Sequence, residues 1–330
     1  MKVVDLHCDV LSLQQKLLIQ GKDYSLLSNP YHIDLLKLKQ GDYLLQSFAV
    51  FANPHNYPDP RKTALDEIGH FQTMIRQFPS WIAQVFSSRD IPDIQRQGKI
   101  GALLTVEGGG DCMENLEDLR LFHQLGTRIM SFTWNYENRL AYPNDIPDGA
   151  EKKSRNHLEN VHGLKPLGFE FLSEMERLGI IMDVSHLSDA GFRDVCRTAT
   201  RPFIATHSNA RTICGHVRNL TDDMLKAIAD HGGVTGINYY PDFLDPEDNL
   251  RDCRSTQEWM VRHISHIRNV AGIDVIALGS DFDGIFGDLE LADCSQVSRL
   301  ADTLRSHGFT SSEIEKIFHK NALRLFQEIF

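Results

Sequence analysis

The sequence predicts an α/β fold of the TIM-like (β/α)8 barrel class, with additional helices at the C-terminal end. Three observations favour this class. Eight short apolar segments read as strands, most of them are separated by segments with helical periodicity, and 330 residues suit one such barrel with additions. The sequence contains neither Gly-x-Gly-x-x-Gly opening a helix nor Gly-x-x-x-x-Gly-Lys, so nucleotide-binding folds lack their usual marker. We expect one barrel domain over residues 1–330.

The strand candidates are short runs rich in aliphatic, β-branched and aromatic residues, as expected of strands that are buried on both faces. Several of them end in a polar residue that can bind a metal or a proton. In chain order they cover residues 3–9, 44–51, 102–107, 128–134, 180–186, 202–207, 234–239 and 275–281.

The helix candidates lie between these strands, where apolar residues recur three and four positions apart. Residues 11–43 mix short helical pieces with polar turns, and 135–162 read as a long polar loop. Two helices close the chain, and we expect the last to begin at the capping box Ser312-x-x-Glu315. The other candidates cover residues 60–78, 115–125, 166–178, 188–199, 221–231 and 255–271.

Composition narrows the classes of partner and the compartment. The formal charge is −11 and no block of Lys and Arg occurs, which disfavours nucleic acid and anionic membranes as partners. No apolar run approaches the ~20 residues needed to span a bilayer. The first residues already read as a strand, so we expect no signal peptide. The six cysteines show no Cys-x-x-Cys spacing, and we expect reduced thiols in a cytoplasmic protein.

The first strand ends in two residues that can bind a metal. His7 and Asp9 are two positions apart, so on a strand their side chains point to the same face. An imidazole and a carboxylate at the end of a first buried strand are typical of metal-dependent barrel hydrolases. The pair alone is a weak signal, because such short patterns arise by chance.

Later strands end in matching residues. Glu107 ends the third candidate, His186 and His207 follow the fifth and sixth, and Asp281 follows the eighth. The C-terminal ends of all barrel strands converge on one mouth, where active sites lie, so the six residues together predict a metal site. Most of the other histidines, such as His263 and His266 on one helix, we expect to be solvated.

The residue types suit two Zn²⁺ ions per chain. Zinc accepts imidazole and carboxylate ligands, and a glutamate such as Glu107 can bridge two ions that lie about 3.5–4 Å apart. The candidate ligands are His7, Asp9, Glu107, His186 and His207.

Nearly end to end, the chain resembles the membrane dipeptidase (renal dipeptidase) family of zinc peptidases. The resemblance rests on the order and spacing of several short motifs. These are Asp5-Leu6-His7-Cys8-Asp9, Val106-Glu107-Gly108-Gly109, His162-Gly163-Leu164, Asp183-Val184-Ser185-His186, Thr206-His207-Ser208, Arg218-Asn219, Gly279-Ser280-Asp281-Phe282-Asp283-Gly284 and Asn321-Ala322-Leu323-Arg324.

The resemblance implies roles for individual residues. The matches to His7 and Asp9 hold one zinc, those to His186 and His207 hold the other, and the match to Glu107 bridges them. It places Arg218 at the substrate's C-terminal carboxylate and Asp281 near its amine and leaving nitrogen. Without the family pattern, Arg218 would read as a surface ion pair and Asp281 as a turn residue before Gly284.

One position departs from the family. Mammalian members carry a histidine after the fourth strand that assists carbonyl polarisation, whereas this chain has Trp134 there. Either the zinc pair supplies enough polarisation or another side chain does, and Asn135 and Tyr136 are both candidates. We expect Trp134 to shape the substrate pocket, because its large apolar body suits a pocket wall.

These expectations describe a cytoplasmic binuclear zinc dipeptidase that cleaves the peptide bond of dipeptides through a metal-activated hydroxide. Asp281 and Glu107 would be catalytic, and Arg218, Asp281 and Trp134 would contact the substrate. The resemblance also makes a homodimer the expected assembly. Two rivals are a related amidohydrolase that acts on a cyclic amide and a non-catalytic barrel that serves as a binding subunit. The first usually opens with His-x-His and uses a bridging lysine, and the second is disfavoured because all five ligands are present.

Overall fold

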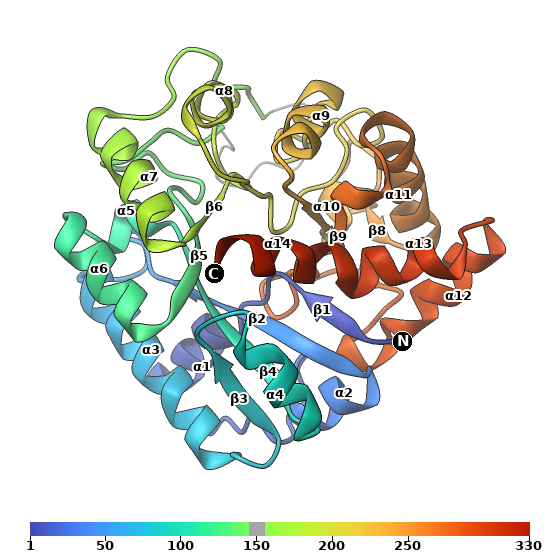
Figure 1. Cartoon of the computed structure of the whole chain (residues 1–330), viewed down its shortest axis with the longest axis horizontal. Helices are drawn as coiled ribbons and strands as arrows, with labels where there is room; N and C mark the ends of the chain where they lie inside the picture. The colour runs from blue at the N-terminus through green and yellow to red at the C-terminus, as the bar shows by residue number, and fades with distance from the viewer. Residues whose placement is uncertain (145–155) are drawn as a thin grey trace.

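The computed structural model describes residues 1–144 and 156–330, and it has the barrel predicted from the sequence (Figure 1). Residues 145–155, part of the long loop expected over 135–162, lie outside the described residues. The barrel wall contains strands in the order β6-β5-β4-β2-β1-β9-β7, all paired in parallel. Their bounds are β1 Val3–Asp5, β2 Tyr43–Phe51, β4 Ile100–Glu107, β5 Thr127–Ser131, β6 Ile181–Asp183, β7 Thr235–Ile237 and β9 Ile276–Leu278.

Residues 204–205 close the ring between β6 and β7. Asp183 pairs with Ile204, and Ala205 pairs with Thr235, both in parallel. The segment predicted at 202–207 therefore fills the remaining strand position in the barrel wall, although its paired part is too short to count as a strand. Each of the predicted strands occupies one position in this wall, and the predicted fold class is confirmed.

Three short strands lie outside this ring. β3 (Ile82–Val85) pairs with the first half of β4, and the sequence analysis did not predict it or the following helix α4 (Asp90–Arg96). β8 (Arg254–Ser255) and β10 (Asp288–Leu289) pair only with each other.

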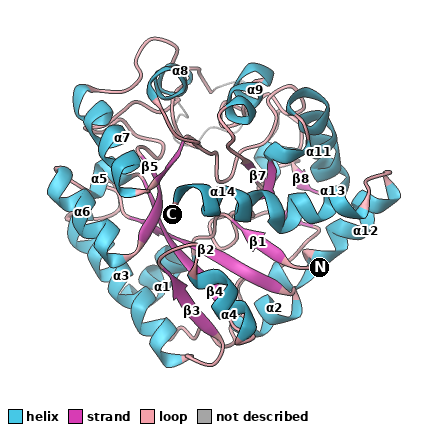
Figure 2. Cartoon of the chain, in the orientation of Figure 1, coloured by secondary structure: helices cyan, strands magenta, loops and turns pink. Residues whose placement is uncertain are grey.

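Helices surround the strands (Figure 2). Those that were predicted lie within two residues of their expected bounds at each end, and α7 matches its expected bounds at both ends. They are α3 Pro60–Gln77, α6 Leu116–Leu125, α7 Pro166–Leu178, α8 Asp189–Thr198, α9 Asp222–Asp230 and α11 Gln257–Ala271. The others are α1 Val10–Ile19, α2 Leu35–Gln40, α5 Gly109–Cys112, α10 Pro241–Leu244, α12 Ser298–Ser306, α13 Ser311–Glu315, α14 Asn321–Ile329, the 3-10 turns η2 Ile273–Val275 and η3 Cys294–Gln296, and the π-helical turn η4 Lys316–Lys320.

Local sequence signals explain where these helices begin and end. The Asp59 side chain accepts the Lys62 N–H before Pro60 opens α3, and Asn115 caps α6 in the same way. α6 ends at Gly126, whose φ of 113° favours glycine.

The expected capping box at Ser312 and Glu315 is wrong. The box is formed two residues earlier, by Thr310 and Glu313, where each side chain accepts a hydrogen bond from the backbone N–H of the other. Both tetrapeptides fit the Ser/Thr-x-x-Glu pattern. The extended backbone of Thr310, with φ −71° and ψ 156°, decides between them, because a cap residue must lie outside the helix.

Two apolar clusters form the core. Alternate residues along the barrel strands, such as Val4 and Leu6, pack inside the barrel, while Val3 faces the surrounding helices. Phe326 and neighbouring residues of α14 join the interior cluster and cover the N-terminal ends of the strands, as seen at the front of Figure 1. The C-terminal ends therefore lie together at the opposite end of the barrel.

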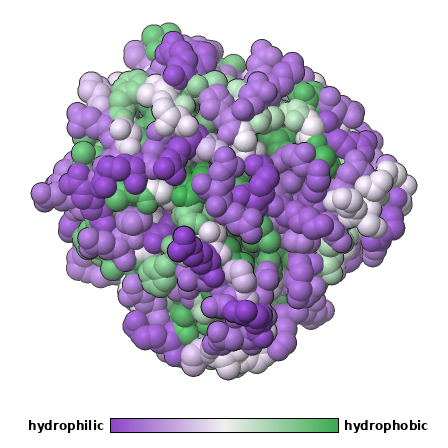
Figure 3. Space-filling view, viewed as in Figure 1, coloured by the Kyte–Doolittle hydropathy of each residue, from purple (hydrophilic) through white to green (hydrophobic). Residues whose placement is uncertain are grey.

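The surface around α14 is mixed in character. In the same view, hydrophilic residues predominate and hydrophobic ones appear in small separate areas (Figure 3). Within the described ranges, no helix has both the length and the apolar character that a membrane crossing requires.

Candidate metal centre and substrate cavity

The structure brings the predicted ligands together at the C-terminal ends of the barrel strands. His7 follows β1, Glu107 ends β4, His186 follows β6 and His207 follows the paired segment at 204–205. Asp9 immediately precedes α1. All five side chains are buried, although each is polar, and a buried polar cluster requires compensating partners.

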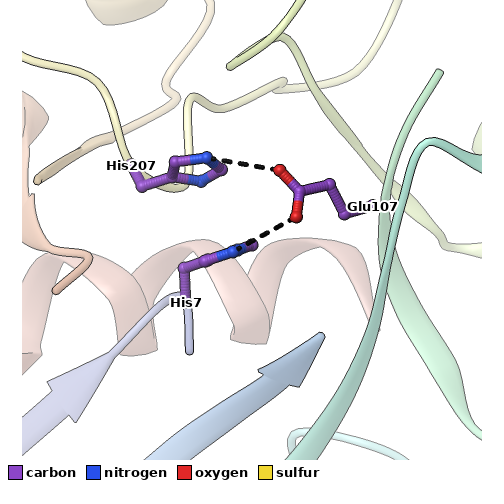
Figure 4. Close-up of side chains that lie close together, drawn as sticks. All are labelled: His7, Glu107 and His207. Atoms are coloured by element: carbon purple, nitrogen blue, oxygen red, sulfur yellow. Dashed lines mark ion pairs between the residues drawn. The ribbon is translucent and has the colours of Figure 1, made fainter. Parts of the chain in front are cut away.

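Glu107 lies at the centre of this cluster, and its two oxygens face different partners. Oε1 lies 2.6 Å from Nε2 of His186 and 3.6 Å from Nε2 of His207. Oε2 lies 3.6 Å from Nε2 of His7 on the other side (Figure 4). One carboxylate thus faces two separate groups of ligands, which is the arrangement that a bridging ligand needs.

The group on the His7 side contains two further carboxylates. Nε2 of His7 lies 3.5 Å from Oδ2 of Asp9 and 3.9 Å from Oδ1 of Asp281. These three residues can hold a metal ion, as can His7, Glu107 and His207. The geometry therefore offers Asp281 as a ligand as well as in the predicted role as an acid–base group.

The electrostatics of the cluster favour a cation. Burial by itself lowers the pKa of His7, but Glu107, Asp9 and Asp281 raise it to about 10. Burial raises the pKa of Glu107 to about 8 and that of Asp281 to about 7. Positive charge among these carboxylates is stabilised, and a divalent ion supplies it more effectively than one proton.

Two of the imidazoles also have the neutral form that a metal ligand needs. Burial lowers the pKa values of His186 and His207, which keeps both rings neutral. Nε2 of His7 is buried and has no hydrogen-bond partner among the described residues. An unpaired buried nitrogen beside carboxylates fits a metal-binding role, so the donor set is suitable for the predicted ions.

Hydrogen bonds fix which nitrogen of each ring faces the site. Nδ1 of His186 lies 3.1 Å from Oδ1 of Asn135, an atom that can only accept, so we place the proton on Nδ1. Thr206 likewise places the proton of His207 on Nδ1. The Thr206 hydroxyl donates to Asp183, and the same oxygen can accept from Nδ1 of His207 at 2.7 Å. Both Nε2 atoms are left as acceptors that face Glu107.

Beneath the site, two buried aspartates form hydrogen bonds that connect neighbouring strands of the barrel. Asp5 accepts the backbone N–H groups of His7 and Ser280, and it also accepts the Ser280 hydroxyl. Asp183 accepts from Ser185 and Thr206 in the same manner. The sequence analysis quoted both aspartates within motifs but assigned them no role. Their spacing, two residues before His7 and three before His186, is the signal that could have indicated one.

The turn that carries Asp281 approaches the ligands closely. Asp281 and Asp283 both have positive φ values, 64° and 69°, which aspartate tolerates better than most residues. A Cβ atom on Gly284 would lie 2.1 Å from Oδ2 of Asp9, so glycine is required there. Oδ2 of Asp281 accepts a hydrogen bond from Asn238 at 2.8 Å, leaving Oδ1 to face His7.

Arg218 is buried beside the second group of ligands. Its Nη1 donates to the backbone oxygen of Ser185 and to Oγ of Ser208, and its Nη2 lies 3.1 Å from Nε2 of His186. Nε has no partner among the described residues, although it is buried. Burial lowers the pKa of Arg218 to about 10, so the guanidinium remains charged at neutral pH. The alternative of a surface ion pair does not fit this position.

One cavity of about 430 Å³ joins these features. Of the predicted site residues, all except His7 line it, and His7 lies beneath with its side chain 3% exposed. Trp134 is half-buried in the wall, 5.1 Å from the ring of Phe51 and 5.4 Å from that of Tyr136. The cavity is therefore flanked by aromatic rings beside the metal-ligand cluster.

The expectation that His263 is solvated is wrong. His263 is fully buried on α11, where Nδ1 accepts the Ala210 N–H and Nε2 lies 2.9 Å from the Leu244 oxygen. The helical pattern missed this because one histidine among apolar neighbours gives no sign of its partners. His266 is half-buried and pairs with Asp222.

Comparison with known proteins places the chain in a family of peptidases. The sequence pattern of the family described as Membrane dipeptidase (Peptidase family M19) matches residues 1–329. An uncharacterized dipeptidase of Schizosaccharomyces pombe is 31% identical over 348 residues, which cover 99% of this chain and 80% of the relative.

Solved structures of metallopeptidases share the whole fold. A metallo peptidase from Rhodobacter sphaeroides, liganded with a phosphinate mimic of the dipeptide L-Ala-D-Ala, superposes with a TM-score of 0.89 at 26% identity, covering 100% of this chain and 99% of the other. Dipeptidase AC, a metallo peptidase of family M19, also gives 0.89, at 27% identity and with 100% and 98% covered.

Proposed function

The chain belongs to the membrane dipeptidase family, and from this premise we propose that it is a dipeptidase with two Zn²⁺ ions per chain. Family membership already makes it a peptide hydrolase with a metal centre. The proposal adds the number and identity of the ions and the roles of the residues. The proposed ligands are His7 and Asp9 for one ion, His186 and His207 for the other, and Glu107 for both.

One observation carries the proposal. The two oxygens of Glu107 face different ligand groups, so a single carboxylate is placed to neutralise and join two cations. When bound, the ions would lower the pKa of a water molecule and polarise the peptide carbonyl.

The protein's own residues would orient the substrate. Arg218 lines the cavity with a buried, charged guanidinium whose Nε has no partner within residues 1–144 and 156–330. Leaving such a donor unpaired is costly, and a substrate carboxylate would satisfy it. We assign this position to the free C-terminal carboxylate of the dipeptide.

Asp281 would handle the proton. Asn238 holds its Oδ2, so Oδ1 is the atom free to accept a proton from the attacking water and to pass it to the leaving nitrogen. Trp134 would form a wall of the substrate cavity, and Asn135 would orient His186. This role uses only the Oδ1 acceptor, so Asn135 remains a candidate to replace the family histidine through its Nδ2 donor.

Three further expectations belong to the proposal. We infer one barrel domain over residues 1–330, a homodimer by family resemblance, and a cytoplasmic location. The six cysteines are all free thiols, which supports a reducing compartment.

A substrate panel tests the proposal. The protein, reconstituted with zinc, is assayed on free dipeptides, tripeptides and a cyclic amide, and its bound metal is counted. We expect hydrolysis of dipeptides with two zinc ions per chain. Equal rates on tripeptides, or activity on the cyclic amide alone, would contradict the proposal and favour the amidohydrolase alternative.

A further inference from the structure

Arg218 lies on a loop, residues 209–220, whose two ends are joined. Ala210 and Leu220 form a parallel bridge, with the Arg211 N–H donating to the Leu220 oxygen at 2.7 Å. The Leu220 N–H donates to the Asn209 oxygen at 2.8 Å. The loop therefore returns to its start just before α9, and Arg218 is held near the closing end.

The side chain of Arg211 hydrogen-bonds to the backbone near the closing end of this loop. Its Nε donates to the backbone oxygen of Asn219 at 2.7 Å, and its Nη2 donates to that of Val217 at 3.1 Å. These residues are the two neighbours of Arg218 in the chain. One guanidinium thus holds the carbonyl groups on both sides of the residue that reaches into the cavity.

The other side of the Arg211 guanidinium is anchored to the metal-ligand segment. Nη1 and Nη2 bond to the two oxygens of Asp189 at 2.7 and 2.8 Å, with both side chains largely buried. Asp189 is the first residue of α8, three residues after His186. Asn144 adds a second tie, because its Nδ2 donates to both Oδ1 of Asp189 and the Val217 oxygen at 3.0 Å.

We propose that the Arg211–Asp189 pair is a positioning device for Arg218 and sets how strongly the site holds the free carboxylate of its substrate. The inference rests on the proposed function of Arg218. Neither Arg211 nor Asp189 is among the described residues that line the cavity, so the pair acts through the backbone on either side of Arg218.

Only arginine can make all of these contacts. Its planar fork donates in two directions at once, toward the carboxylate and toward the carbonyl groups. A lysine at this position keeps the charge opposite Asp189 but presents a single compact ammonium group. The loop would keep its ion pair and lose the fixed geometry around Arg218.

The test compares Arg211→Lys with the wild-type enzyme on a free dipeptide and on its C-terminally amidated analogue. We expect the KM for the free dipeptide to rise about tenfold, the loss typical of one charge-assisted hydrogen bond. The kcat, the zinc content and the KM for the amidated analogue should change little. Asp189→Asn, which keeps the shape and removes the charge, should give the same pattern.

A matched control is available at the other end of the barrel. Arg128 is also buried and donates to the backbone oxygens of Phe86, His123 and Thr127 near the start of β5. Arg128→Lys should lower the melting temperature without separating the two substrates. If Arg211→Lys behaves like this control, the pair has only a structural role and the inference is overturned.

A double variant connects the effect to Arg218. In the Arg218→Ala background, Arg211→Lys should cause no further rise in KM, because the group that it positions is gone. A full additional tenfold rise would overturn the inference. If Arg218→Ala weakens the free and amidated substrates equally, the proposed function of Arg218 fails first. If Arg218→Ala is selective and Arg211→Lys is not, the inference alone fails.

Discussion

Nη2 of Arg218 lies 3.1 Å from Nε2 of His186, so the cation proposed to bind the substrate carboxylate contacts a proposed metal ligand. This contact limits the number of residues between the cleaved bond and the C-terminus of the substrate. A carboxylate bound by Arg218 can be separated from a carbonyl at the metal centre by little more than one residue, since a residue spans at most ~3.6 Å. In the proposed mechanism, the contact therefore explains why a single residue would follow the cleaved bond.

Replacing Arg218 should separate substrates by their C-terminal group. Arg218→Ala removes the charged donors, and we expect the kcat/KM for free dipeptides to fall about 10²-fold, the loss of one or two charge-assisted hydrogen bonds. C-terminally amidated analogues should be affected much less. Arg218→Lys should recover only part of the loss, because an ammonium cannot form two parallel bonds. Steady-state kinetics on both series provides the measurement, and equal losses would assign Arg218 a structural role.

Replacing the proposed bridging carboxylate should remove metal and activity together. Glu107→Gln puts a neutral amide where two groups of ligands require negative charge. We expect fewer than two ions per chain and a loss larger than the ~10–100-fold that follows from disturbing a partner of a ligand. Elemental analysis and dipeptide assays on the same sample check this.

A suitable control for that variant is Glu174→Gln, which removes a carboxylate that pairs with Arg120 and Arg177 away from the site. It should leave the zinc content unchanged. Full hydrolytic activity of purified wild-type protein carrying less than one metal per chain would refute the binuclear mechanism.

Replacing Asp281 distinguishes its two possible roles. As the group that carries the proton, Asp281→Asn should retain both metals and lose ~10²–10⁴-fold in turnover, the usual contribution of general acid–base catalysis. The position of Asp281 with His7 and Asp9 also allows it to be a ligand. Metal counting decides, because loss of one ion from this variant would make Asp281 a ligand.

The barrel and the clustering of the proposed ligands were predictable because each depends on a local pattern. Buried parallel strands appear in the sequence as apolar runs, and their C-terminal ends converge regardless of the length and conformation of the loops. Glu107 and His207 could therefore be assigned to the same end of the barrel from their positions in the sequence alone. β3 gave no such pattern. It is short and half-buried, and it pairs only with β4.

The residues that support the ligands could not be predicted in this way. Asn135 is 51 positions from its partner His186, and Arg211 is 22 positions from Asp189. Their roles depend on hydrogen bonds that form only when the barrel has folded. The environment of His263 was predicted wrongly for the same reason, since its buried partners Ala210 and Leu244 lie 53 and 19 positions away in the chain.

Trp134 is the position at which we expected a departure from the histidine of mammalian family members, and its surroundings support a role in shaping the cavity. The ring lies between Phe51 and Tyr136 and has its centre 6.3 Å from that of His186. It is half-buried and lines the cavity. A bulky ring in that position excludes volume from the substrate site, so removing it should admit larger side chains.

We therefore expect Trp134→Ala to change the ranking of dipeptides by side-chain size while hydrolysis of the smallest ones persists. Because the ring is half-buried, the loss of stability should be smaller than the ~3–5 kcal/mol typical of a fully buried aromatic residue. Phe132→Leu is the matched control, since Phe132 is two residues away, fully buried and outside the cavity lining. The control should lower the melting temperature and leave the ranking unchanged. A uniform hundredfold fall in turnover for Trp134→Ala, with stability intact, would instead mean that the indole N–H donates to the reacting carbonyl, because losing such a donor costs ~10²–10³-fold without regard to side-chain size.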